Sequence, residues 1–154
     1  TPPARTAMFP ALLPDFEAPQ LRTYPVYTVI AEKYHAMVVL DLANSRMKDF
    51  YDLMVIAQRT RLDGATLAAA MAATFARRAT PLPGAPPLAL TARFGEDAGK
   101  VLQWQAFLRK NRRAAGSLAG TVELLSRLLW PATQVAAAQS SANASWIPEV
   151  GNWV

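Results

Sequence analysis

The sequence predicts an all-α fold, and three observations lead to that prediction. Hydrophobic residues make up 52% of the chain, and alanine, the residue that most favours helices, is common among them. Apolar residues recur at three- and four-residue steps in several segments, which is the period of a helix. No segment alternates apolar and polar residues as a half-buried strand does. We therefore expect one helical domain of five to six helices, preceded by an extended proline-rich segment.

The prolines suggest how the chain is divided. Residues 1–25 contain prolines at positions 2, 3, 10, 14, 19 and 25. Because proline lacks an N–H and disrupts a helix interior, this segment is predicted to be an extended linker. Pro131 is expected to end the last helix after Leu129. The helical domain is therefore predicted to span residues 26–130, with a tail over residues 131–154.

Each predicted helix has a start or stop signal. Pro25 suits the first turn of the first helix, and Asn44 or Ser45 is expected to cap the second. Asp63 and Gly64 open the third, and a loop with four prolines over residues 80–87 separates it from the next. We expect helices over about 26–40, 46–59, 65–78, 97–110 and 117–129, with a short helical turn after residue 91.

The first two predicted helices carry charge where a packing helix would not. Lys33 lies in the middle of an apolar stripe formed by Val26, Val29, Ile30, Met37 and Leu40. A lysine on a stripe that faces the core needs a counter-charge or a ligand, because an unpaired buried charge is strongly unfavourable. Asp49 and Asp52 on the second helix are the natural partners. We expect the two helices to pack antiparallel, with Lys33 within ion-pair distance of Asp49 or Asp52.

These two helices also carry two recognisable motifs, Thr28-Val-Ile-Ala-Glu-Lys33 and Asn44-Ser-Arg-Met-Lys-Asp49-Phe-Tyr-Asp52-Leu53. Together they resemble the C-terminal half of the AbiEii/AbiGii-type nucleotidyltransferase toxins, which belong to type IV toxin–antitoxin and phage-defence systems. The resemblance continues through residues 75–83, 103–108 and 146–153, and so covers nearly the whole chain. One departure is Tyr27, because the family commonly has a glutamate just before the first motif.

The resemblance implies roles for individual residues. Lys33 and Asp49 match catalytic positions, and Lys33 is expected to neutralise the phosphates of an incoming nucleotide. Arg46, Lys48 and Asp52 are expected to assist in binding the substrate. The intact family is expected to use Mg²⁺ and to transfer nucleotides from a nucleoside triphosphate to RNA such as tRNA. The structural alternative for Lys33 is a simple ion pair with a neighbouring carboxylate.

The sequence lacks the part of this site that would hold a metal. The family supplies it from a Gly-Gly or Gly-Ser turn followed by an Asp-x-Asp strand, whereas the nearest pattern here is Asp15-Phe-Glu17, without a glycine turn. We therefore expect the chain to be the C-terminal portion of such an enzyme, to bind no metal or nucleotide cofactor alone, and to be inactive alone. The alternative is a non-catalytic helical module that binds an antitoxin, a catalytic partner chain or RNA.

Charge and composition limit the remaining possibilities. The formal charge of +5 permits contact with RNA, and the densest basic run covers residues 109–113. A solvated helix end is the ordinary alternative for that run. The single histidine, His35, is expected to pack or donate a hydrogen bond rather than bind a metal. The absence of cysteine agrees with a cytoplasmic location, and no segment is expected to enter a membrane.

Overall fold

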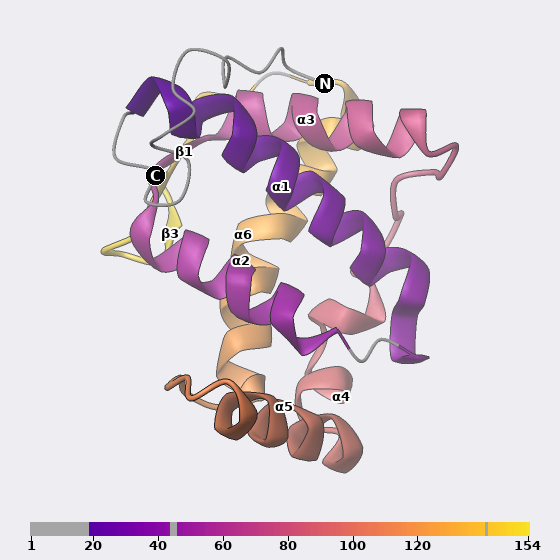
Figure 1. Cartoon of the computed structure of the whole chain (residues 1–154). Helices are drawn as coiled ribbons and strands as arrows, with labels where there is room; N and C mark the ends of the chain where they lie inside the picture. Colours follow the sequence, from indigo (N-terminus) through magenta and orange to yellow (C-terminus); the bar gives the residue numbers. More distant parts are fainter. Residues whose placement is uncertain (1–18, 44–45, 141) are drawn as a thin grey trace.

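The computed structural model describes residues 19–43, 46–140 and 142–154. Helices dominate this part of the chain, and the only strands in it are three very short ones (Figure 1). The all-α prediction is therefore confirmed. The helices are α1 (Pro19–Leu40), α2 (Met47–Arg59), α3 (Gly64–Arg77), α4 (Ala92–Gly95), α5 (Ala98–Lys110) and α6 (Leu118–Ala138), with 3₁₀ turns η3 (Asp41–Ala43) and η4 (Leu88–Leu90). The strands are β1 (Leu62–Asp63), β2 (Ser145–Ile147) and β3 (Asn152–Trp153).

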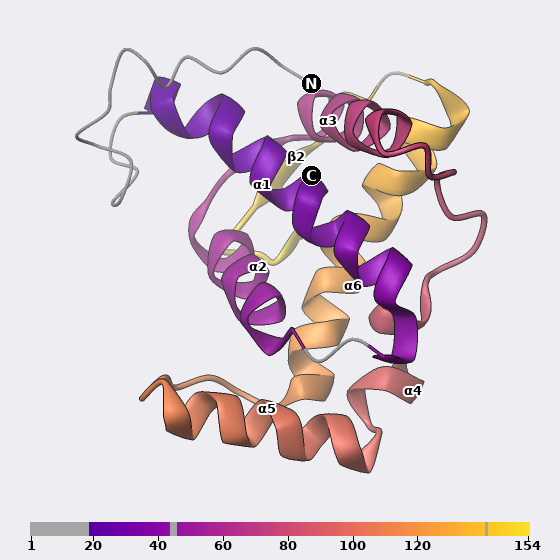
Figure 2. The same cartoon turned by 45° about the vertical axis from the view of Figure 1, so that its right-hand side comes forward.

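Helix α6 runs through the middle of the molecule, with α3 across one end and α4 and α5 at the other (Figures 1 and 2). Helix α1 packs mainly along α3, while α2, α3 and α4 pack against α6. In both views α1 and α2 run in opposite directions, as the sequence predicted. The core between these helices contains large side chains that are fully buried, among them Tyr34, Phe50, Phe75, Phe94, Trp104 and Trp146.

Three helix starts are stabilised by capping side chains. The side chains of Asp63, Asp97 and Ser117 each accept a hydrogen bond from the backbone N–H three residues later, at 2.9, 3.0 and 3.0 Å. Each bond satisfies an N–H that the first helical turn cannot pair. The predicted starts of α3, α5 and α6 are therefore confirmed to within one residue.

The start of α2 is different. Its capping position is Arg46, which makes no side-chain capping bond. Asn44 and Ser45, the predicted caps, lie outside the described residues, as does the part of the predicted linker over residues 1–18.

Two predicted helix boundaries are wrong, and both involve proline. Helix α1 begins at Pro19 and contains Pro25, whereas the sequence predicted a start at residue 26. Helix α6 continues through Pro131 to Ala138 instead of ending at Leu129. A proline inside a helix removes one backbone hydrogen bond. In α6, burial of the residues on both sides of Pro131 offsets that loss, namely Leu128, Leu129, Ala132 and Thr133.

The residues after α6 also form structure that the sequence did not predict. β2 pairs antiparallel with both β1 and β3, and Trp146 lies opposite Leu62 on one side and Trp153 on the other. Trp146 is fully buried, and its Nε1 donates to the Ala57 carbonyl of α2 at 2.7 Å. Strands of two or three residues are too short to show alternation, so only tertiary contacts reveal them.

A buried hydrogen bond fixes α1 against α6. The hydroxyls of Tyr34 and Thr133 are hydrogen-bonded at 2.8 Å, and both residues are fully buried. Burial raises the pKa of Tyr34 to about 12, so this side chain stays neutral at physiological pH. Tyr34 follows Lys33 directly, so the bond helps to hold the turn of α1 that carries the lysine.

Candidate functional site

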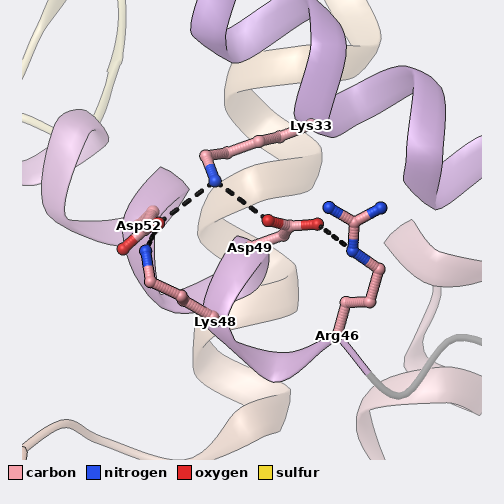
Figure 3. Close-up of polar contacts among 5 residues, drawn as sticks. All are labelled: Lys33, Arg46, Lys48, Asp49 and Asp52. Atoms are coloured by element: carbon pink, nitrogen blue, oxygen red, sulfur yellow. Dashed lines mark hydrogen bonds and ion pairs between the residues drawn. The ribbon is translucent and has the colours of Figure 1, made fainter.

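Lys33 of α1 lies between two carboxylates of α2 (Figure 3). Its Nζ is 2.9 Å from Asp49 Oδ1 and 3.1 Å from Asp52 Oδ2. Because Asp49 and Asp52 are three residues apart, they lie on neighbouring parts of one helix surface, and the short connection between the helices brings α1 alongside. The prediction that Lys33 lies within ion-pair distance of Asp49 or Asp52 is confirmed, and the structure shows the lysine paired with both.

Two further cations complete this group of five residues. Arg46 Nε is 2.9 Å from Asp49 Oδ2, and Lys48 Nζ is 2.7 Å from Asp52 Oδ2. The side chain of Asp49 is only 5% exposed, whereas that of Lys48 is 73% exposed. Asp49 Oδ2 accepts no hydrogen bond from the described residues, so its contact with Arg46 is an ion pair without hydrogen-bond geometry. We call Lys33, Arg46, Lys48, Asp49 and Asp52 the charged cluster; it has three cations and two carboxylates.

The two carboxylate partners of Lys33 keep this lysine protonated. Partial burial on its own lowers the pKa of this lysine, but the hydrogen bonds and negative charges of Asp49 and Asp52 outweigh that effect. The net result is a pKa above the ordinary value for lysine. Lys33 is therefore a permanent cation at neutral pH, able to attract phosphate but unsuited to act as a base.

A second ion-pair group lies beside the first, and the sequence did not predict its cations. Glu32 of α1 pairs with both Arg77 and Arg78 at the end of α3, with Arg78 Nε 2.9 Å from Oε1. Next to it, His35 Nε2 is hydrogen-bonded to Thr80 Oγ1 at 2.9 Å. Burial, aided by the charge of Arg78, lowers the pKa of His35, which agrees with a neutral, hydrogen-bonding histidine.

Both ion-pair groups border one hollow of about 510 Å³ that runs along α1. Its basic side chains are Lys33, Arg46 and Arg78. In each ion-pair group the cations outnumber the carboxylates by one. The hollow therefore has an excess of positive charge, as a site for a polyanion requires. We call it the first hollow; its other lining residues are Thr28, Val29, Glu32, His35, Ala36, Val39 and Leu40.

One residue of the predicted apolar stripe does not face the core. Val29 is 37% exposed and Val39 is 55% exposed, so α1 presents apolar side chains on its outer side as well as to α3.

Tyr27, the residue at which the chain departs from the family motif, lies outside the charged cluster. It is buried, and its hydroxyl accepts the Asp63 N–H at 2.8 Å. Tyr27 thus supports the start of α3 and does not take part in the charged cluster.

The charged cluster does not fit a metal ion by itself. Asp49 and Asp52 are both already paired with cations. Across the described part of the chain, no three carboxylate or histidine side chains gather in a way that could hold one. Mg²⁺ is usually held by one or two carboxylates together with water and phosphate oxygens, and in this cluster both carboxylates face cations instead.

A comparison with known protein families agrees with this geometry. Residues 1–136 match the family described as nucleotidyl transferase AbiEii toxin, type IV toxin–antitoxin system. The chain belongs to the AbiEii family. No curated protein and no solved structure matches it.

Membership of the AbiEii family places this chain among the toxin-type nucleotidyltransferases, and a toxin–antitoxin family implies an antitoxin as partner. The match includes α1 and α2 with the whole charged cluster. Among the described residues, no helix has the length and apolar character needed to cross a membrane.

Proposed function

We propose that this AbiEii-type domain binds the triphosphate of an incoming nucleoside triphosphate and positions it so that the nucleotidyl group can be transferred to RNA. The observation that carries the proposal is the position of Lys33, a fixed cation between Asp49 and Asp52 at the edge of a positively charged hollow. Lys33 and Asp49 are the proposed catalytic pair. Arg46 and Lys48 are proposed to contact phosphate, and Asp52 to hold Lys33 and Lys48 in place.

The chemistry of nucleotidyl transfer explains why such a cation is useful. An acceptor hydroxyl oxygen bonds to the α-phosphorus, the bond from that phosphorus to the bridging oxygen breaks, and pyrophosphate leaves while the hydroxyl proton passes to solvent. Negative charge on the phosphate oxygens must be balanced throughout. Lys33 can do this without reorganising, because Asp49 and Asp52 already fix its position.

Asp49 is proposed to keep Lys33 and Arg46 at a fixed spacing from each other. Its Oδ1 holds Lys33, while the opposite oxygen faces Arg46. A carboxylate that is almost completely buried between two cations cannot swing away, so it positions both of them relative to the phosphates.

The remaining requirement is a partner that supplies metal-binding carboxylates. We propose a Gly-Ser/Asp-x-Asp catalytic core of the same family, which brings Mg²⁺ and closes over the outer side of α1. The exposed Val29 and Val39 support this, because both line the first hollow and would be buried by such a core. The same exposed side chains support the alternative function, a non-catalytic module whose α1 binds an antitoxin or another partner chain.

The proposal is tested by measuring nucleotide transfer to RNA with and without an added catalytic core. The chain alone, incubated with Mg²⁺, labelled nucleoside triphosphates and total tRNA, is expected to transfer no nucleotide, because its described residues include no group of three side chains arranged to hold a metal ion. Adding a family core, fused upstream or as a separate chain, is expected to give labelled RNA. Robust labelling by the chain alone would show that the proposed division of the site is wrong. A core that binds tightly but never yields labelled RNA would favour the non-catalytic module.

A further inference from the structure

A second hollow lies on the other side of Lys33, between α1, α2 and the end of α5. It has a volume of about 420 Å³ and shares Val29 and Lys33 with the first hollow. Lys33 therefore lies where the two hollows meet. The second hollow is lined by Val29, Lys33, Tyr51, Asp52, Val55, Ile56, Arg59 and Arg113.

Two arginines of the second hollow have no carboxylate partner. Arg59 ends α2 and Arg113 follows α5; both are exposed, and neither forms an ion pair with any residue that the structure describes. Arg113 is nevertheless held in place, because its guanidinium lies 5.6 Å from the centre of the Tyr51 ring. An ordered arginine without a counter-charge is available to an external anion.

The backbone next to Arg113 forms the turn that ends α5. Arg112 has a φ of 52°, the left-handed conformation that commonly follows a helix. Ala79 and Gln139 have the same φ after α3 and α6, so this turn is an ordinary helix end. Its backbone hydrogen bonds, from Arg112 N–H to the Arg109 carbonyl at 3.2 Å and from Arg113 N–H to the Leu108 carbonyl at 2.9 Å, fix the direction in which the basic residues leave the helix.

The same turn extends the positive charge away from Lys33. Arg109, Lys110, Arg112 and Arg113 are all exposed, and the run from 109 to 113 contains no carboxylate. Lys110 also borders a further hollow of about 440 Å³, together with Arg46 and Lys48 of the charged cluster. Basic side chains of the charged cluster and of the end of α5 therefore border the same hollow.

We propose that the second hollow and the turn over residues 109–113 bind the phosphate backbone of the acceptor RNA, just before the hydroxyl that receives the nucleotide. This inference rests on the proposed function, since it uses Lys33 as the point where donor and acceptor meet. With the donor triphosphate in the first hollow, an acceptor in the second approaches it across Lys33. Guanidinium groups suit phosphate oxygens because they can donate two parallel hydrogen bonds. An acidic protein surface is the competing partner.

The test measures RNA binding by the 154-residue chain itself. Fluorescence anisotropy with a labelled single-stranded RNA, over a series of salt concentrations, gives the Kd and its salt dependence. The double substitution Arg112→Ala/Arg113→Ala is expected to weaken binding about tenfold and to reduce the slope of log Kd against log salt by about 0.7 for each phosphate that the variant no longer neutralises. Arg113→Lys is expected to keep most of the slope, because it keeps the charge.

Arg93→Ala is the matched control for Arg113→Ala. Arg93 is an exposed arginine on α4 that lines none of the three hollows described above, so its loss changes the net charge equally but is expected to leave the Kd within about twofold. Circular dichroism checks that each variant is folded. Equal effects of Arg93→Ala and Arg113→Ala would overturn the proposal, as would a double variant that binds RNA normally. Displacement of the RNA by polyglutamate at equal charge concentration would assign the surface to an acidic protein instead.

The proposed function and this inference fail in different ways. With a catalytic core supplied, Arg113→Ala is expected to raise the KM for RNA and leave the KM for the nucleoside triphosphate unchanged. If Lys33→Ala abolishes transfer while the arginine variants bind RNA normally, only the RNA surface is wrong. If the arginine variants lose RNA binding while Lys33→Ala transfers normally, only the nucleotide site is wrong.

Discussion

Lys33→Ala is expected to lower nucleotidyl transfer by about 100-fold or more when a family catalytic core is supplied. The substitution removes a cation that Asp49 and Asp52 hold in position, and loss of one preorganised group that stabilises transition-state charge typically costs about 10²–10³ in rate. Asp49→Asn is expected to cause a comparable loss of activity. The substitution keeps the shape of the side chain but removes the negative charge that holds Lys33 and Arg46 in position. The measurement is the initial rate of labelled nucleotide incorporation into tRNA.

Stability measurements separate this effect from unfolding. Lys33 is partly exposed, so its removal is expected to reduce the free energy of unfolding by no more than about 1–2 kcal/mol. The pKa of Lys33 is raised, so its contribution to stability is complete below the ordinary lysine value of 10.5 and is lost only as pH rises through the folded-state pKa. Thermal unfolding at pH 7 measures the change in stability of each variant. Arg93→Ala is the control. If Lys33→Ala and Asp49→Asn enzymes both remained fully active, the cluster would be structural charge only.

Trp146→Ala is expected to lower the free energy of unfolding by about 3–5 kcal/mol, the usual cost of removing a large aromatic side chain from a core. Trp146 is fully buried, lies opposite Leu62 in the sheet, and donates a hydrogen bond to Ala57 of α2. Its loss would leave a cavity and an unpaired carbonyl at the end of the helix that carries Asp49 and Asp52. Urea denaturation followed by circular dichroism measures the change.

Two variants serve as controls for Trp146→Ala. Trp146→Phe keeps an aromatic ring but loses the hydrogen bond, so a smaller loss of about 1–2 kcal/mol is expected. Leu102→Ala removes a side chain that is 65% exposed, and a change within about 0.5 kcal/mol is expected. A loss below about 1 kcal/mol for Trp146→Ala would mean that the residues after α6 contribute little to the stability of the fold.

The sequence was most informative where a feature depends on neighbouring residues. The starts of α3, α5 and α6 were predicted to within one residue, and the capping bonds of Asp63, Asp97 and Ser117 that stabilise them each span only three residues. The approach of Lys33 to Asp49 and Asp52 was predictable for a related reason. A short connection forces two consecutive helices to run antiparallel, and helical spacing then places the lysine opposite both carboxylates.

Tertiary structure alone decided the features that depend on distant residues. Pro25 and Pro131 remain inside helices because packing of their neighbours offsets one missing hydrogen bond, and local propensity cannot report that packing. The pairing of Trp146 with Leu62 joins strands far apart in the chain, each too short to have a pattern. Arg59 became a site candidate, and Arg113 could be placed beside Lys33, only when α2 and the end of α5 were seen to border one hollow. The sequence by itself determined the helices and the central ion pair, whereas the surfaces around that pair depend on contacts between helices that no local pattern encodes.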